Sequence, residues 1–387
     1  MPPQPPVRVG ILVDTSTGWG RRLIRGVAGY ASKHGRWQLW VEGRGQDEAL
    51  RMPPGWVGDG VIARISDEGI AQHVAALGVP AVNISSIELA QDHFPRVATD
   101  LRATGELAAQ YFLDRGLRNF AYCGLPRLSY VRQQYDGFAT RLGQGGFRCP
   151  AFTPRPVRGT SRGWQAGQQD LIDWLRDLPK PVGILTWATR RGREVLDACR
   201  CAGLLVPEQV AVLGGDDDEL LCEVCSPSLS GIVVASEQIG HEAAALLDRL
   251  LLGRRPPRQP MLMAPVGVVT RQSTDTLAIE NAAIAQAIRF IRKHAAEPIT
   301  VRDVLREVPI SRRQLERQFQ DCLGRSPATE IRRVHLERAK VLLTSTDLPI
   351  PQVALGSGFG TPEYLACVLK NTTGLSPLKY RSQSRGR

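Results

Sequence analysis

The sequence contains no long hydrophobic run. Of its 387 residues 43% are apolar, but the uninterrupted apolar stretches are short, as at residues 9–13. A helix that crosses a bilayer needs about 20 consecutive apolar residues, so none is expected here. The N-terminus also lacks the basic region and apolar stretch of a secretory signal. We therefore expect a soluble cytoplasmic protein with two or three domains.

Common enzyme signatures are also missing. The chain has no Walker-type phosphate loop, no zincin motif and no nucleophile elbow. Gly18-x-Gly20 follows the first expected strand, and Glu42 ends the next one, which resembles part of a dinucleotide-binding fingerprint. However, Leu23 occupies the third glycine position. An NAD-dependent enzyme therefore stays a remote alternative, and we expect neither catalysis nor a cofactor.

The eight cysteines fit a reducing compartment, in which most would be small buried apolar groups. Cys199 with Cys201 and Cys222 with Cys225 form two close pairs, which leaves a four-thiolate zinc site as an alternative. The first pair lies in an expected helix, where residues two apart point in different directions. We therefore expect no metal site.

Positive charge is concentrated at one end of the chain. Residues 285–387 contain 18 Lys and Arg against 9 Asp and Glu, whereas the remaining residues contain 31 against 29. A basic terminal region on a nearly neutral body predicts a polyanionic partner for that region only. The alternative is a basic face that contacts only solvent.

Residues 7–273 alternate short apolar runs with amphipathic stretches. We expect strands at 7–13, 37–42, 60–65, 79–85, 119–124, 181–187 and 210–215, and helices near 20–33, 68–77, 101–115, 132–143, 165–178, 190–202 and 237–252. Short, almost wholly apolar strands between helices predict parallel sheets covered on both faces. The segment is longer than one simple doubly wound sheet requires, so we expect two lobes. A ligand is expected beyond the carboxyl ends of their strands.

After a linker at residues 274–284, the sequence predicts only helices. Their start signals are explicit, since capping boxes begin at Thr300 and Ser311, and hydroxyl residues precede prolines at Ser326, Thr361 and Ser376. The expected helices are 284–295, 301–307, 312–323, 327–343, 350–356, 362–372 and a short turn after 377.

Two pairs of these helices have the spacing of helix-turn-helix units. They are 301–307 with 312–323, and 350–356 with 362–372, and the long helix between them would hold both units against adjacent major-groove segments about 34 Å apart. Each second helix has an apolar stripe that should face the core, formed by Leu315, Phe319 and Leu323 in the first pair and by Leu365, Val368 and Leu369 in the second.

The opposite faces carry the side chains that suit DNA. On the first unit we expect base or backbone contacts from Arg312, Arg313, Gln314 and Arg317. On the connecting helix, Arg332, Arg333 and Arg338 are expected to hold phosphates, and on the second unit Thr361, Glu363 and Lys370 complete the set. The alternative is a small helical bundle with a solvated basic face.

These C-terminal motifs resemble the DNA-binding domain of AraC-type transcription regulators. The resemblance consists of Ser-Arg-x-x-Leu-x-Arg-x-Phe from Ser311, Leu-Gly-x-Ser-Pro from Leu323, Leu-Glu-x-Ala-Lys from Leu336, and Gly-x-Ser-Pro-x-x-Tyr-Arg from Gly374. It covers residues 285–382 and implies two recognition helices that bind double-stranded DNA.

Four positions depart from that family pattern. Pro309 stands where a glycine is usual, Cys367 replaces an arginine, and Leu365 and Leu369 replace phenylalanines. We therefore expect the first unit to carry most of the base readout, and the second mainly to position the protein.

Residues 7–273 resemble the periplasmic-binding-protein-like sensors of LacI/GalR regulators. With the C-terminal motifs, this architecture is similar to the xylose-operon activators of the AraC class. The resemblance implies an α/β two-lobed sensor with parallel sheets and an all-α C-terminal domain with two helix-turn-helix units. We expect residues 1–6 to be a disordered N-terminus, 7–273 the sensor, 274–284 the linker, 285–382 the DNA-binding domain and 383–387 a basic tail.

A sugar site needs carboxylates that accept hydrogen bonds from hydroxyl groups, an arginine that holds them, and an aromatic ring that packs against the apolar face of the sugar. Residues at the expected strand ends supply these groups. Asp14 ends the first strand, with Trp19 nearby. The resemblance adds Arg132 and Asp216, which match positions at which LacI-type sensors contact a sugar. Asp14 could instead cap the next helix, and Asp217 and Asp218 are expected to be caps.

The largest departure in the sensor is Ala188-Thr189, where related sensors have Asn-Asp. The pocket loses a carboxylate there and gains the indole of Trp187. The resemblance implies a dimeric activator of pentose catabolism genes that is controlled by a sugar such as xylose. Such an activator binds operator DNA and engages RNA polymerase. The alternatives are a regulator with a non-sugar effector and one with a vestigial sensor.

Overall fold

The computed structural model describes residues 6–34, 37–45, 48–89, 93–125, 128–152, 161–275 and 281–384. Most of the expected N-terminal segment, half of the expected linker and the last three residues of the expected basic tail lie outside these ranges. The chain forms two compact units, of which the first comprises Met1–Ala109 and Asn119–Asp275. The second comprises Gln110–Arg118 together with Thr276–Arg385. Each unit is described separately below.

The first unit contains a four-stranded parallel sheet in the order β2-β1-β3-β4. Its strands are β1 (Val7–Leu12), β2 (Trp37–Val41), β3 (Gly60–Ala63) and β4 (Ala81–Asn83). All four were predicted. Every residue of β3 and β4 and the last four residues of β1 are buried, as expected for strands covered on both faces.

A six-stranded sheet in the order β12-β10-β9-β8-β6-β7 forms the other lobe. Its strands are β6 (Asn119–Cys123), β7 (Ala151–Phe152), β8 (Val182–Thr186), β9 (Val210–Gly214), β10 (Ser230–Val233) and β12 (Gly267–Val269). Only β12 is antiparallel to its neighbour. A parallel pair of β5 (Val97–Thr99) and β11 (Met261–Met263) completes the unit. The prediction of two lobes with parallel sheets is therefore confirmed.

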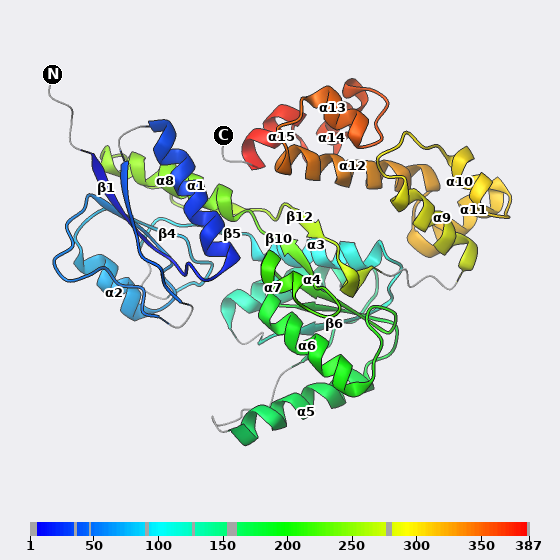
Figure 1. Cartoon of the computed structure of the whole chain (residues 1–387), viewed down its shortest axis with the longest axis horizontal. Helices are drawn as coiled ribbons and strands as arrows, with labels where there is room; N and C mark the ends of the chain where they lie inside the picture. The colour runs from blue at the N-terminus through cyan, green and yellow to red at the C-terminus, as the bar shows by residue number, and fades with distance from the viewer. Residues whose placement is uncertain are drawn as a thin grey trace. The chain divides into compact units, whose positions relative to one another are not determined.

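Helices cover these sheets. They are α1 (Gly18–His34), α2 (Glu68–Ala76), α3 (Leu101–Leu113), α4 (Ser129–Gly143), α5 (Ser161–Asp177), α6 (Thr189–Ala202), α7 (Glu219–Glu223) and α8 (Ser236–Leu251), followed by a 3₁₀ turn at Gln272–Thr274. Helices α1 and α8 lie side by side (Figure 1). A Cβ at Gly26 or Gly240 would lie about 2 Å from a carbonyl oxygen of the facing helix, so glycine is needed at both positions.

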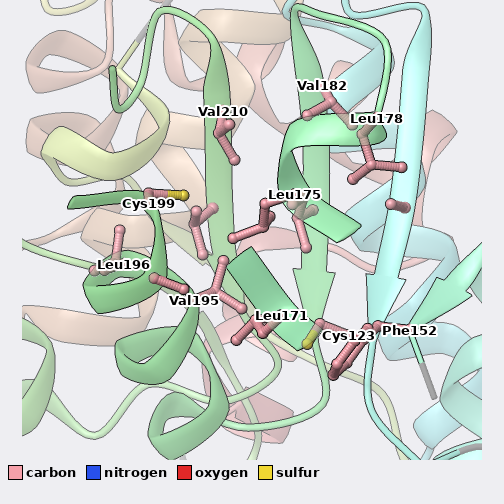
Figure 2. Packing of buried hydrophobic residues seen from close by; sticks show 14 of the residues in the cluster. Cys123, Phe152, Leu171, Leu175, Leu178, Val182, Val195, Leu196, Cys199 and Val210 are labelled. Carbon is pink, nitrogen blue, oxygen red and sulfur yellow. The ribbon is translucent and has the colours of Figure 1, made fainter. Parts of the chain in front are cut away.

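The core of the second lobe is an apolar layer between helices and sheet. Figure 2 shows Leu171 and Leu175 of α5 and Val195 and Cys199 of α6 pointing toward the strands, where Val182 also lies. All five side chains are buried. This layer fixes the strand ends from which the cavity residues project.

The second unit is helical, as predicted. Its helices are α9 (Ala282–Lys293), α10 (Val301–Glu307), α11 (Arg312–Leu323), α12 (Pro327–Ser345), α13 (Ile350–Gly356), α14 (Pro362–Thr373) and α15 (Pro377–Ser384). The predicted capping boxes at Thr300 and Ser311 are present. Gly324 and Gly374 end α11 and α14 with φ of +68° and +76°, a conformation that favours glycine.

Two small cores divide this unit. One joins α9, α10, α11 and the start of α12 around Phe319, and the other joins the rest of α12 to α13 and α14 around Phe359. Helices α11 and α14 thus belong to separate subdomains, and α12 belongs to both. Among the described residues, no helix of either unit is long and apolar enough to cross a membrane.

Candidate effector cavity and nucleic-acid interface

A cavity of about 200 Å³ lies in the first unit at the carboxyl ends of strands from both sheets. Thr17, Arg64 and Ser85 follow strands of the four-stranded sheet, and Trp187 and Asp216 follow strands of the six-stranded sheet. Drug-sized ligands occupy about 300–1,000 Å³, so this volume suits a smaller molecule. The cavity lies beyond the strand ends, which is where a ligand was predicted to bind.

Arg64 supplies the positive charge of the cavity. Its Nη1 donates a hydrogen bond to Asp14 Oδ2, and its guanidinium lies over the Trp19 ring, 5.8 Å from the centroid. Asp14 is only 2% exposed and does not line this cavity, so it acts on the cavity through Arg64. Arg64 was not among the predicted ligand residues, although it follows strand β3 and the strand-end rule that found Asp14 would have included it.

Asp216 supplies the negative charge. Its Oδ1 accepts hydrogen bonds from the backbone N of Thr189 at 2.5 Å and from Thr189 Oγ1 at 2.7 Å. Burial raises the pKa of the Asp216 carboxyl, the two bonds from Thr189 lower it in part, and the charge of Asp218 raises it further. No hydrogen bond to Oδ2 is seen among the described residues, which leaves this oxygen to accept from a ligand.

Aromatic side chains form walls of the cavity. Trp19, Tyr130 and Trp187 all line it, and the rings of Tyr130 and Trp187 meet edge to face at 5.8 Å. Gln134 also lines it, and its Oε1 accepts from Tyr122 at 2.9 Å, so its amide nitrogen is left to donate. Apolar plates with a few fixed donors and acceptors are typical of small-ligand sites.

The structure does not bring Arg132 to this cavity. Arg132 lies on α4, and its side chain is exposed, whereas Val131 and Gln134 of the same helix are buried and line the cavity. Successive residues of a helix are rotated by about 100°, so the residue after Val131 points elsewhere. Of the five expected ligand residues, Trp19, Trp187 and Asp216 line the cavity.

The Gly18-x-Gly20 segment has a packing role. The N–H of Gly18 donates to Asp218 Oδ2 at 2.8 Å, and that of Gly20 donates to Thr17 Oγ1 at 3.1 Å. A Cβ at Gly20 would lie 1.9 Å from the carbonyl oxygen of Asp14. The start of α1 is thus held by protein groups, which favours a structural explanation over a dinucleotide fingerprint.

The acidic residues that follow β9 and the cysteine pair of α6 have structural surroundings of their own. Asp218 caps α7, as expected, and Asp217 pairs with Arg271 at 2.6 Å. Cys199 is buried and Cys201 is exposed on the same helix. The described residues contain no group of three or more His, Cys, Asp and Glu side chains placed to hold a metal ion.

The outward face of α11 is basic. Leu315 and Phe319 are buried as predicted, and Arg313 and Arg317 are exposed on the opposite face, without a partner among the described residues. Two more of the expected DNA contacts have local roles. Gln314 Oε1 accepts from the backbone N of Ser311 in the capping box at 3.0 Å, and Arg312 Nε donates to Glu316 at 3.1 Å.

The arginines of α12 divide into an exposed and a paired set. Arg332 is exposed, whereas Arg333 donates to both oxygens of Glu330, at 2.9 and 2.7 Å, and its Nη1 lies 3.2 Å from Asp114 Oδ2. Arg338 donates to the carbonyl oxygen of Gly356 at 2.6 Å. The structure therefore leaves Arg332 as the phosphate candidate, because Arg333 is already neutralised.

The second recognition helix, α14, is less basic. Thr361 caps it by accepting from the backbone N of Tyr364 at 3.2 Å, and Glu363 and Lys370 are exposed. Tyr364, which was not among the predicted DNA contacts, is 46% exposed. The two turns also differ, because Gly358 has φ of +75° whereas Val308, before Pro309, is extended.

Comparison with known proteins covers nearly the whole chain. Residues 8–104 match the XylR N-terminal domain, residues 109–274 a periplasmic binding protein-like domain and residues 304–383 a helix-turn-helix domain. The xylose operon regulatory protein of Escherichia coli strain K12 is 32% identical over 97% of this chain and 96% of that protein. That of Haemophilus influenzae is 28% identical over 97% and 98%.

A solved structure agrees with these relatives. The structure of the xylose-binding transcription activator xylR is 31% identical, covers 97% of both chains and gives a TM-score of 0.62. These relatives are regulators, and the expected combination of a periplasmic-binding-protein-like sensor with a helix-turn-helix domain is confirmed. The chain belongs to the family of xylose operon regulatory proteins and is a DNA-binding transcription regulator with a sugar-sensing domain.

Proposed function

We propose that D-xylose binds in the cavity of the first unit and controls the binding of α11 and α14 to operator DNA. The observation that carries this proposal is the meeting of Arg64, Asp216 and three aromatic side chains in one small cavity. The names of the relatives, which are xylose operon regulators, support the choice of sugar.

The cavity chemistry fits a polyhydroxylated ring. Asp216 Oδ2 can accept hydrogen bonds from hydroxyl groups, and the hydroxyls of Ser85 and Ser86 can accept from or donate to them. Arg64 can donate to a ring or hydroxyl oxygen. The rings of Trp19 and Trp187 offer apolar faces to C–H groups. Thr189 replaces a carboxylate usual in related sensors, but its hydroxyl orients Asp216, so one carboxylate stays available.

Calorimetric titration of the full chain with D-xylose, L-arabinose, D-ribose, D-glucose and sugar phosphates tests the effector. We expect binding of xylose and weaker binding of the others, because each unpaired buried polar group costs about 1–3 kcal/mol. Binding of another sugar alone would reassign the effector. If none of these sugars binds, a non-sugar effector or a vestigial sensor is favoured. A titration with NAD tests the alternative of a dinucleotide-dependent enzyme.

A matched pair of variants tests the site. Arg64→Gln should weaken xylose binding by a factor of about 10–100, since a hydrogen bond from a charged group contributes about 1.5–3 kcal/mol. Arg132→Gln lies outside the cavity and should leave the affinity within a factor of two. The opposite ranking would restore Arg132 as the sugar-contacting arginine.

We also propose that the protein acts as a homodimeric activator that engages RNA polymerase. Two copies would place two pairs of recognition helices on repeated half-sites. Sedimentation with and without operator DNA measures the stoichiometry, and transcription from a linked promoter by purified RNA polymerase measures activation. A monomer on a single half-site, or repression of that promoter, would contradict this part of the proposal.

A further inference from the structure

Helix α3 connects the effector cavity to the DNA-binding unit. It begins at Leu101, which lines the cavity, and it ends at Leu113, inside the segment 110–118 that packs with the second unit. A helix of this length extends about 20 Å. A single helix therefore has its first residue at the cavity and its last turn in the second unit.

The cavity end of α3 is firmly packed. A Cβ at Gly105 would lie 2.1 Å from the carbonyl oxygen of Gln134, and a Cβ at Gly137 would lie equally close to that of Arg102. Helix α4, which carries Gln134 and Tyr130 into the cavity, therefore contacts α3 backbone to backbone. Such close packing transmits a displacement, because neither helix can yield by moving a side chain.

The other end of α3 is held by a buried ion-pair network. Asp114 Oδ1 accepts from Arg325 Nη1 at 2.8 Å, and Asp114 Oδ2 lies 3.2 Å from Arg333 Nη1. Arg325 and Arg333 also donate to Glu330, which is fully buried in α12. Hydrogen bonds and charge from these arginines outweigh burial and hold the pKa of Glu330 below its usual range.

Further contacts join the same segment to α9 and α11. Arg118 Nη2 donates to the carbonyl oxygen of Cys322 in the last turn of α11. Burial, and then the charge of Arg115, lower the pKa of Arg292 in α9 to about 9. The loss of the Asp114 charge would leave Arg325 and Arg333, two guanidinium groups with little exposure, to share the carboxylate of Glu330.

We propose that α3 is the mechanical connection between effector and operator, and that Asp114 is its attachment point on α12. The inference rests on the proposed function, since it requires a ligand in the cavity. A ligand that moves the start of α3 changes the position of Asp114, and with it the placement of Arg325, Glu330 and the first recognition helix. For this connection to act as a switch, the ligand must favour one of two placements.

The experiment uses the full chain and an operator selected from random DNA by the wild-type protein. The dissociation constants for operator, with and without D-xylose, give a coupling ratio, and titration gives the affinity for xylose. We expect a wild-type ratio of about fivefold or more. In Asp114→Asn the ratio should fall to within about a factor of two of unity, with the xylose affinity unchanged, because Asp114 lies outside the cavity.

Glu106→Gln is the matched control. Glu106 is an exposed carboxylate of the same helix, so its variant should keep the wild-type ratio. A wild-type ratio in Asp114→Asn would overturn the proposal. If that variant fails to fold, hydrogen exchange in the wild-type protein decides instead: xylose must change the exchange of amides in 110–118 and in the first turns of α12, and no change in either segment overturns the proposal.

The two proposals fail in distinguishable ways. If xylose neither binds nor alters operator affinity in the wild-type chain, the proposed effector is wrong. In that case the operator affinity of the ligand-free protein tests whether Asp114 links α3 to α12. A change of about fivefold in Asp114→Asn, with none in Glu106→Gln, would support it, and equal affinities in all three proteins would overturn it.

Discussion

Burial of the Asp216 carboxyl in the cavity wall is expected to lower the stability of the fold at neutral pH. Burial raises the pKa of this carboxyl above the unfolded value of about 3.9, and Thr189 restores only part of the lost solvation. A carboxyl with a raised folded pKa favours the protonated form, so its stabilising contribution is complete below the unfolded pKa. That contribution is lost as the pH rises through the folded pKa.

We therefore predict that Asp216→Asn leaves the first unit at least as stable at pH 7, and reduces xylose affinity by a factor of about 10–100. The asparagine oxygen can still accept both hydrogen bonds from Thr189. Thermal unfolding at pH 4–8 and calorimetric titration measure the two effects. A variant that is less stable than wild type at pH 7, or that binds xylose normally, would contradict the assigned role.

Strand ends predicted some positions of the cavity but not all, since Asp14 follows β1 without lining the cavity, and Trp19, in the first turn of α1, does line it. Trp187 and Asp216 follow their strands directly, so locating β8 and β9 located them as well. Arg132 lies on a helix, where an error of one residue changes direction by about 100°, and the cavity receives Val131 and Gln134 instead. The ion pair of Asp14 with Arg64 joins residues 50 positions apart, and no local pattern reveals it.

Among the secondary-structure elements, helices with caps were the most predictable. Helices α10, α11 and α13 begin and end at the predicted residues, because local hydroxyl, proline and glycine signals define their ends. The short strands β5, β7, β10, β11 and β12 were not predicted. Each has two to four residues, too few for a clear alternating pattern, and each forms only because a neighbouring strand offers hydrogen bonds.

The exposed face of α11 leads to a prediction about sequence readout. Arg317 projects opposite Leu315 and Phe319, and a guanidinium so placed can donate to a guanine edge. Arg317→Ala should cost about 1–3 kcal/mol on the selected operator and much less on random DNA. Fluorescence anisotropy with both DNAs measures the difference. Equal losses on the two would assign Arg317 to the phosphate backbone.

A second prediction concerns α12, on which the structure separates two adjacent arginines. Arg332 is exposed and should contact phosphate, so Arg332→Ala should weaken binding to the operator and binding to random DNA to the same extent. It should also reduce the slope of log affinity against log salt by about 0.9. Arg333→Gln is the comparison, because its guanidinium is bound to Glu330 and Asp114. An equal loss of salt slope in both variants would show that Arg333 also reaches DNA.

The whole molecule shows an organisation that the sequence does not reveal. Residues 110–118 comprise the end of one predicted sensor helix and the turn before the next predicted strand, yet Asp114 in this segment pairs with Arg325, more than 200 positions away. Glu330 belongs to a charged stretch of α12 that predicts an exposed face, yet it is fully buried. The first feature depends on long-range ion pairs of Asp114 with Arg325 and Arg333, and the second on pairs of Glu330 with the same two arginines close by in sequence; neither leaves a periodic signal.

Because the chain forms two compact units, we predict two thermal transitions that respond differently to ligand and pH. Xylose at about 100 times its dissociation constant should stabilise the first unit by about 2.7 kcal/mol. The second unit should respond to acid, since Glu330 has a lowered folded pKa. Its contribution is complete above the unfolded pKa of about 4.3 and is lost as the pH falls toward the folded value.

Scanning calorimetry between pH 3 and pH 7 measures this acid response. The transition of the second unit should fall in temperature below about pH 4.3 in the wild-type protein. In Glu330→Gln the transition temperature of the second unit should already be lower at pH 7, because Arg325 and Arg333 lose a buried partner. That temperature should also depend less on pH than in the wild-type protein. Parallel pH profiles for the two proteins would show that the network around Glu330 does not govern the acid stability of the DNA-binding unit.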